Sequence, residues 1–340
     1  MLAVILGCGP LTINDNVDPL LEQLSYEYPH VKFISIKAGF NTRYEVEGAG
    51  EALKSLTKIT SNNNIHKNSF NLIGFTNLDG RKYFEKVLKP LKINSTIVRN
   101  EGTNINEIER ASKAKINIPT HIFSELPLKE MYEAFAIPYV NILPYGEDPF
   151  KQMVREIEEN FHVNVRSKLN PWENKIKRYK EKLEGKRVLI AASLGREINI
   201  ACSCMALGLE TTVYTCFLPE IASGNIKYVM ENGGEINIEK SVYETLRKGL
   251  EEDFDFIIGD WIFAPLALKK GAWFLSRISI ATCDNPGYLG ILRLGEILTR
   301  RIDNPAKKWR RLAEKYDLFF DRILENESWE GDEGEWRVLS

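Results

Sequence analysis

The sequence has no long apolar run and few cysteines. No stretch of its 340 residues approaches the roughly 20 apolar residues that cross a membrane. No basic and apolar leader opens the chain, so we expect a cytoplasmic protein with no membrane partner. Five cysteines, an odd number in a chain of this length, argue against a disulfide framework. The net charge of -2 gives no case for a nucleic-acid partner.

Two glycine-rich phosphate-binding motifs are also missing. The sequence contains no GxxxxGK[ST], so nucleotide hydrolysis is not expected of this chain. No GxGxxG follows the apolar run at residues 71–74, so a dinucleotide cofactor is not supported either.

What the sequence does contain is a strand–helix–strand pattern from its beginning. Residues 3–40 read as an apolar strand, a turn that carries Cys8, a helix that starts at Asp18-Pro19, and a second strand. Ligands of open α/β sheets gather beyond the carboxyl ends of the strands, and Cys8 stands at such an end. A glycine-rich link at residues 39–50 is expected to follow, and then a short helix at residues 51–56.

Strands and helices then alternate in two longer series. Strands are expected at residues 71–75, 95–98, 115–118 and 139–143, and again at 187–191, 210–215, 254–259 and 277–281. This alternation predicts an α/β fold with several Rossmann-like domains and parallel sheets. The expected organisation is a truncated first domain (1–60), a second domain (61–165), a third domain with a bridging helix (166–310), and a C-terminal helix with an acidic tail (311–340).

Polar residues that follow the expected strands are the candidates for chemistry. His121 begins a loop, and its imidazole suits metal binding or proton delivery, or a hydrogen bond within the loop. Ser124 shares this loop and could line the same cleft as a cofactor-binding residue. Arg43 and Arg196 could clamp substrate carboxylates or form surface ion pairs. Asp260 ends a strand and could donate a proton if desolvated, or cap the next helix.

Several segments together resemble one family, the nitrogenase component 1-type oxidoreductases. The segments are GCGPLTINDNVDPL, SIKAGF, FNLIGFTNLDGRKYFEKVLKPLKI with IERASKAKINI, GKRVLIAASLGREINIACSCMALGLE, and NPGYLGILRLGEIL. The resemblance runs from Cys8 to about Pro305. It implies three Rossmann-like domains around a shared cleft, assembled as a homodimer or with a sister subunit. It also aligns Tyr288 with the family's Gly-Tyr-x-Gly turn.

The resemblance implies that Cys8 ligates an iron–sulfur cluster, with thiolate as the soft ligand that iron prefers. A four-iron cluster takes about four ligands, so most of them would come from another chain. The alternative for Cys8 is a small buried hydrophobe. Cys283 lies at the rim of the implied pocket. His121 aligns with the nitrogenase cofactor cysteine, but no imidazole stands near Cys283, so a true nitrogenase cofactor is not expected.

The implied function is that of a component 1-like subunit in a two-component reductase. An ATP-dependent iron–sulfur partner would supply electrons, and a small-molecule substrate would be reduced in the cleft between domains. One alternative is a non-catalytic scaffold or carrier for a metallocofactor or tetrapyrrole. A sensor that uses the fold without a cluster is a further alternative, because one fold hosts many functions.

Overall fold

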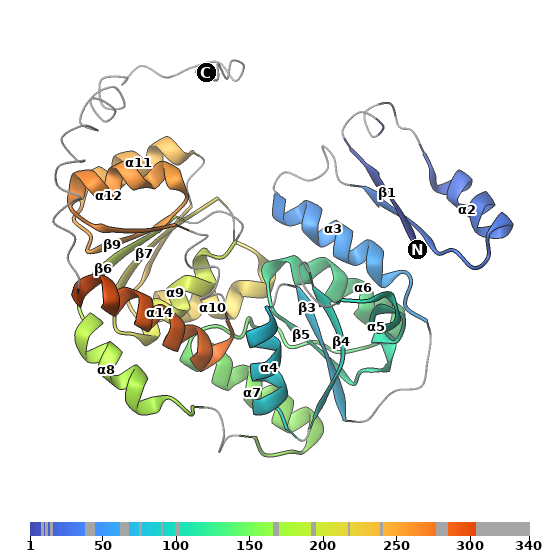
Figure 1. Ribbon diagram of the computed structural model, residues 1–340, viewed down its shortest axis with the longest axis horizontal. Helices are drawn as coiled ribbons and strands as arrows, with labels where there is room; N and C mark the ends of the chain where they lie inside the picture. Colours follow the sequence, from blue (N-terminus) through green and yellow to red (C-terminus); the bar gives the residue numbers. More distant parts are fainter. Residues whose placement is uncertain are drawn as a thin grey trace.

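The computed structural model describes residues 1–7, 10, 13, 16–37, 45–61, 68–74, 77–89, 91–98, 103–165, 170–191, 195–216, 218–238, 241–276 and 285–303. Within these ranges every strand pair is parallel, and the strands form three separate sheets (Figure 1). The α/β class with several parallel sheets is therefore confirmed. The exact domain boundaries stay a prediction.

The N-terminal unit is a two-stranded sheet with one helix between its strands and one after them. Its elements are β1 (Leu2–Leu6), α2 (Asp18–Glu27), β2 (Phe33–Lys37) and α3 (Glu45–Thr57). Asp18 fixes α2 to β2, because its carboxylate accepts hydrogen bonds from Ser35 Oγ at 2.7 Å and Lys37 Nζ at 3.2 Å. Helix α3 begins inside the segment that was expected to be a glycine-rich link, so that expectation is wrong over residues 45–50.

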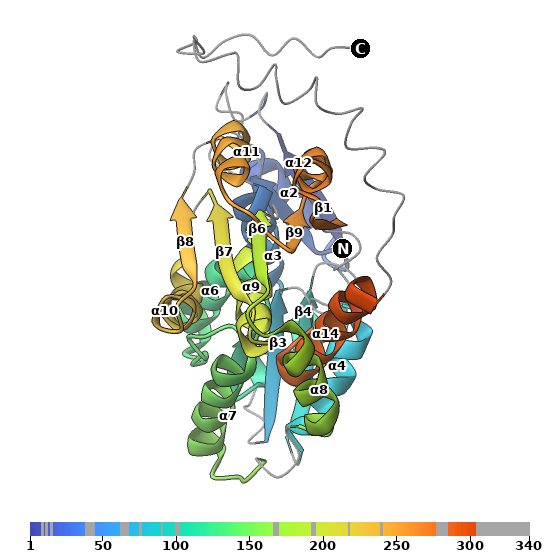
Figure 2. The same ribbon diagram turned by 90° about the vertical axis from the view of Figure 1, so that its left-hand side faces the viewer.

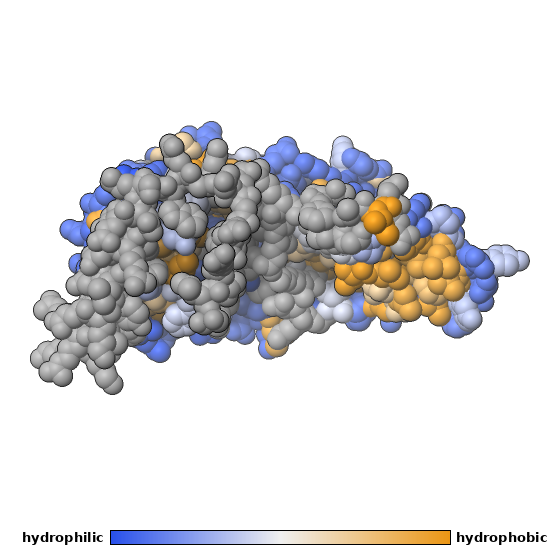
Figure 3. All heavy atoms as spheres, turned by 90° about the horizontal axis from the view of Figure 1, so that it is seen from above, coloured by the Kyte–Doolittle hydropathy of each residue, from blue (hydrophilic) through white to orange (hydrophobic). Residues whose placement is uncertain are grey.

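Apolar side chains remain exposed on this N-terminal unit. Leu2, Ile5 and Leu20 are 46%, 69% and 56% exposed, and Figure 3 shows an apolar patch over the same unit. A continuous apolar strand in a parallel sheet is normally covered on both faces. Strand β1 is covered only in part, because helices α2 and α3 pack mainly against its neighbour β2.

The middle sheet has the order β4-β3-β5. Its strands are β3 (Ser69–Gly74), β4 (Lys92–Val98) and β5 (Ile116–Pro119), and its helices are α4 (Leu78–Val87), α5 (Ile105–Glu109), η1 (Ala111–Lys113), η2 (Ile122–Ser124) and α6 (Glu125–Phe135). The chain passes from β3 to β4 on one side and then returns to place β5 on the other side of β3. The order of the strands therefore reverses at the boundary between β3 and β5. The strand expected at residues 139–143 is wrong, since only an isolated bridge joins Tyr139 to Asn117 there.

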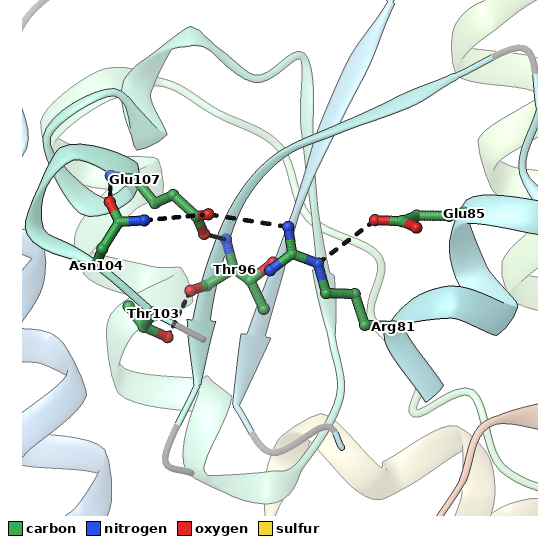
Figure 4. Close-up of polar contacts among 6 residues, drawn as sticks. All are labelled: Arg81, Glu85, Thr96, Thr103, Asn104 and Glu107. Atoms are coloured by element: carbon green, nitrogen blue, oxygen red, sulfur yellow. Dashed lines mark hydrogen bonds and ion pairs between the residues drawn. The ribbon is translucent and has the colours of Figure 1, made fainter. Parts of the chain in front are cut away.

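A carboxylate caps the backbone of the edge strand β4 (Figure 4). The Thr96 N–H donates to Glu107 Oε2 at 3.3 Å, and Asn104 Oδ1 accepts from the Glu107 N–H at 2.9 Å as the cap of α5. Arg81 from α4 lies 3.8 Å from the same carboxylate and also pairs with Glu85. These contacts attach α5 and α4 to β4. They also give the buried carboxylate of Glu107 hydrogen-bond and ion-pair partners, so its burial has a structural explanation.

The third sheet has the order β10-β9-β6-β7-β8, and Figure 2 shows β8, β7, β6 and β9 side by side. Its strands are β6 (Arg187–Ala191), β7 (Glu210–Thr215), β8 (Glu235–Ile238), β9 (Phe256–Gly259) and β10 (Trp273–Ser276). Its helices are α9 (Glu197–Ala206), η4 (Glu220–Ala222), α10 (Ser223–Glu231), α11 (Val242–Glu251), η5 (Trp261–Phe263) and α12 (Ala264–Lys270). The chain reverses direction across the sheet between β6 and β9. The strand expected at residues 277–281 lies outside the described residues.

Three long helices join the middle and third parts. They are α7 (Glu147–Phe161), α8 (Glu173–Leu183) and α14 (Gly287–Asp303), and α14 packs against α7, α8 and α9. One continuous apolar core includes Ile34 of the first sheet, Phe70 of the middle sheet and Phe256 of the third. Among the described residues, no helix is long and apolar enough to cross a membrane.

Candidate functional site

The carboxyl ends of the middle and third sheets approach each other at the contact between Ile122 and Gly195. Ile122 of η2 follows β5, and Gly195 follows β6. A Cβ atom placed on Gly195 would lie 1.7 Å from Ile122 Cδ1, so the two loops touch where a side chain has no room. In open α/β sheets, ligands bind beyond the strand ends at the point where the strand order reverses. Both sheets bring that point to this contact, which we call the interdomain site.

On the middle-sheet side, His121 is fully buried and holds the start of η2. Its Nδ1 accepts a hydrogen bond from the Phe123 N–H at 3.3 Å, and its ring lies against the Phe123 ring with centroids 3.9 Å apart. An accepting Nδ1 carries no proton, so the imidazole is neutral with its proton on Nε2. Such a ring can offer an N–H to a neighbouring group, and the expected role of His121 in hydrogen bonding within the loop is present as well.

Ser124 fixes this turn from within. Its Oγ lies 2.5 Å from the carbonyl oxygens of Ile73 and His121, and it accepts from the His121 N–H at 3.3 Å. The turn needs glycine at position 74 (φ +121°), because a Cβ atom on Gly74 would lie 2.4 Å from Ser124 Oγ and displace the hydroxyl. The hydroxyl is therefore engaged in positioning His121.

On the third-sheet side, charged residues gather where β6 and β9 end. Arg196 precedes α9, Glu197 is its first residue, and Asp260 follows β9. Glu197 is 3% exposed. Burial, together with the negative charge of Asp260, raises the pKa of Glu197 to about 8, although its own backbone N–H and the positive charge of Arg196 act in the opposite direction. At neutral pH its carboxyl is therefore mostly protonated.

Glu197 is the residue that sequence reasoning missed. The sequence places it directly after Arg196 at a strand-to-helix turn, which marks the position, but an acidic residue in the first helical turn ordinarily indicates an exposed carboxylate that favours the helix dipole. Asp260 was considered as a proton donor or a cap. It precedes η5 but makes no side-chain capping bond to it, so the capping interpretation is wrong.

Tyr288 lies in a different environment from the residues at the strand ends. It is 3% exposed, its hydroxyl donates to Glu147 Oε1 at 3.2 Å, and its ring packs edge-on against Phe150. Burial and the Glu147 charge raise the pKa of the Tyr288 hydroxyl. The Gly287 N–H also donates to the Pro144 carbonyl at 2.7 Å. These contacts attach α14 to the start of α7, and a role for Tyr288 in cofactor binding stays a prediction.

Polar contacts on either side of the site hold the middle and third parts together. Asn225 of α10, fully buried, exchanges two hydrogen bonds of 2.9 Å with the backbone N–H and carbonyl of Leu143. Lys129 of α6 reaches Glu220 at 2.8 Å and Glu125 at 3.0 Å, and both bonds raise the pKa of its ammonium. The interdomain site is therefore bordered by fixed contacts.

The described residues do not supply the ligand set of a metal cluster. They contain no group of three or more His, Cys, Asp and Glu side chains placed to hold a metal ion. Cys202 and Cys204 are buried in α9, and burial raises the pKa of Cys202 to about 12. A thiol held protonated in this way is a poor ligand. Cys8, Cys283 and Arg43 lie outside the described residues.

The chain resembles known proteins in both sequence and fold. Residues 1–303 match the family model of the nitrogenase component 1 type oxidoreductases. The structure of nitrogenase Cp1 at pH 6.5 superposes with a TM-score of 0.73 at 14% sequence identity, covering 99% of this chain and 78% of that chain. Nitrogenase Cp1 at pH 5 gives a TM-score of 0.67 at 15% identity, covering 91% and 71%. No curated protein matches the chain. At these identities the structures show a shared fold.

Proposed function

The chain belongs to the nitrogenase component 1 type oxidoreductase family, and on that premise we propose that it is a component 1-like subunit of a two-component reductase. In this role it takes electrons from an ATP-dependent iron–sulfur partner and reduces a small molecule at the interdomain site. The observation that carries the proposal is the meeting of two strand-order reversals at the Gly195–Ile122 contact.

The side chains around that contact suit the binding and protonation of a substrate. His121 carries its proton on Nε2 and is held by Ser124, so it can donate a hydrogen bond from a fixed position. Arg196 contributes a positive charge at the start of α9. The protonated carboxyl of Glu197 contributes an acidic proton, so the third sheet can supply protons that accompany reduction.

An iron–sulfur cluster forms part of the proposal through Cys8. In this role Cys8 is the ligand contributed by this chain, and a second chain, either a sister subunit or a second copy, supplies most of the others. The cluster supplies one-electron chemistry when bound. In this proposal Cys8 is the residue of this chain on which the cluster depends.

Metal analysis tests the proposal. The chain is purified without oxygen, alone and with a co-expressed sister subunit, and iron, sulfide and the reduced-state EPR spectrum are measured for the wild type and for Cys8→Ala. The matched control is Cys216→Ala, which removes an exposed thiol at the end of β7. We expect iron and sulfide in the complex, lost in Cys8→Ala and kept in Cys216→Ala.

Other outcomes would contradict the proposal. A colourless, metal-free protein in both preparations would leave the carrier and the sensor alternatives. A complex that binds a metallocofactor or tetrapyrrole and releases it unchanged, with the reductase and ATP present, would indicate the carrier.

A further inference from the structure

The first turn of α9 contains an acidic side chain that the fold buries without satisfying it. Glu197 is 3% exposed, and among the described residues its Oε2 has no hydrogen-bond partner. An unsatisfied buried polar atom costs about 1–3 kcal/mol. Sites that retain such a cost are often functional, because the geometry is kept for a ligand or a reaction.

A second buried side chain in the same turn has the same property. Asn199 is 1% exposed, and neither its Nδ2 nor its Oδ1 has a partner within the described part of the chain. Residues three apart share a helix face, which places Asn199 in line with Cys202. Cys202 abuts Gly146 of the middle part, so Asn199 belongs to the side of α9 that faces the domain boundary.

Charged residues stand beside Glu197 where strands β6 and β9 end. Asp260 follows β9, is half-buried, and precedes Trp261, which is 66% exposed. Arg196 is the N-cap residue of α9 and directly precedes Glu197, and His121 precedes η2 on the other side of the Gly195–Ile122 contact. Glu197 therefore has a partly solvent-accessible carboxyl among its charged neighbours, and it follows by two residues the glycine at which the two sheets meet.

We propose that Glu197 is the proton donor of the interdomain site, with Asp260 relaying protons to it from solvent. The inference rests on the proposed reductase function and names the acid of that site. Glu197 fits this role better than Asp260 alone, because the buried carboxyl keeps its proton at neutral pH.

The proton transfer from Glu197 accompanies the electron that the iron–sulfur reductase of the proposed function supplies. When the iron–sulfur reductase supplies an electron to the substrate, the carboxyl O–H bond of Glu197 breaks, and a new bond forms between its proton and the reduced substrate atom. Glu197 is left as a carboxylate beside Arg196. A proton passed from water by way of Asp260 restores the acid, so one proton enters for each electron taken up.

The protonation of Glu197 can be measured without any substrate. The chain, in complex with its sister subunit, is labelled with 13C at glutamate carboxyls and titrated from about pH 5 to about pH 10 by infrared difference spectroscopy. We expect a protonated carboxyl at pH 7 that ionises near pH 8 and is missing in Glu197→Gln. Asp260→Asn removes a neighbouring negative charge, so it should move this ionisation to lower pH.

Turnover is then measured with protons as the probe substrate. The complex, its reductase and ATP are assayed for dihydrogen, with iron content measured on each sample. Glu197→Gln keeps the shape but cannot give a proton, and we expect a rate roughly 100-fold lower with unchanged iron. The wild-type rate should fall above about pH 8. The control is Glu158→Gln in α7, whose buried carboxylate accepts from the Val165 N–H at 2.8 Å and should affect neither readout.

Two results would overturn the inference while leaving the proposed function in place. One is a Glu197 carboxyl that is already ionised at pH 6, and the other is wild-type dihydrogen evolution by Glu197→Gln. A wild-type complex without iron would instead contradict the proposed function, and the inference would fall with it. The iron measurement distinguishes the two cases.

Discussion

Replacing Glu197 by Gln should change how the stability of the chain depends on pH. The folded chain holds the Glu197 proton up to about pH 8, whereas the unfolded chain loses it near its ordinary pKa of 4.5. Between these values the folded state binds one proton more than the unfolded state. The free energy of unfolding therefore falls as pH rises, by about 1.4 kcal/mol for each pH unit.

The magnitude follows from the two pKa values. Stability that is fully present below pH 4.5 is lost as pH rises to about 8, a total of about 5 kcal/mol. At pH 7 the loss is about 3 kcal/mol. Glu197→Gln has no ionisable proton at this position, so its free energy of unfolding does not fall in this way. Relative to the wild type, the variant should therefore become more stable by about these amounts as pH rises, whereas below pH 4.5 the stabilities of the two should depend on pH alike.

Urea unfolding at a series of pH values measures the difference. Tryptophan fluorescence follows the transition, and the shift in midpoint at an unchanged slope gives the difference in free energy. Glu158→Gln is the control, since it replaces another buried carboxyl that already has a backbone partner. A difference between Glu197→Gln and the wild type that stays constant from pH 5 to pH 8 would refute the buried, protonated carboxyl.

Three further substitutions test the contact between the sheets. Gly195→Ala should lower the free energy of unfolding by about 2–5 kcal/mol, because it adds both strain at φ +66° and a clash with η2. The control is Gly185→Ala, which has φ +73° but open space around it and should cost about 1–2 kcal/mol. Equal thermal midpoints for the two variants would contradict the close approach of Gly195 to Ile122. Asn225→Ala leaves the Leu143 backbone unsatisfied and should cost about 2–4 kcal/mol in urea unfolding, so a cost below about 1 kcal/mol would contradict the observed pairing. Lys129→Met removes a half-exposed ion pair and should cost under about 1 kcal/mol, whereas a larger loss in calorimetry would mean that this pair is desolvated.

The sequence predicted those parts of the fold that local pattern determines. Strands β3, β6 and β9 are short apolar runs that end at small residues, and such runs are typical of buried parallel strands. Strand β8 was missed because it is short, partly exposed and rich in polar residues, as an edge strand is. The apolar residues of the run at 139–143 are buried against other elements although the run is not a strand of a sheet. Its apolar character therefore led to the wrong prediction of a strand.

The candidate site could be predicted only in part. His121, Arg196 and Asp260 stand just after strands, and the topology of parallel sheets indicates that such positions gather at one edge. Glu197 could not be recognised in this way, because the burial of an acidic side chain depends on which elements pack around it. The approach of Gly195 to Ile122 likewise depends on the arrangement of two sheets, which no local pattern specifies.

ATP-dependent electron uptake is the most direct measurement of the proposed function. The oxidised complex of this chain with its sister subunit is mixed without oxygen with the iron–sulfur reductase, with and without ATP, and its EPR spectrum is followed over time. A component 1-like subunit predicts a reduced cluster signal that requires both the reductase and ATP and is lost in Cys8→Ala. A spectrum that stays unchanged when both are added to an iron-loaded complex would contradict it.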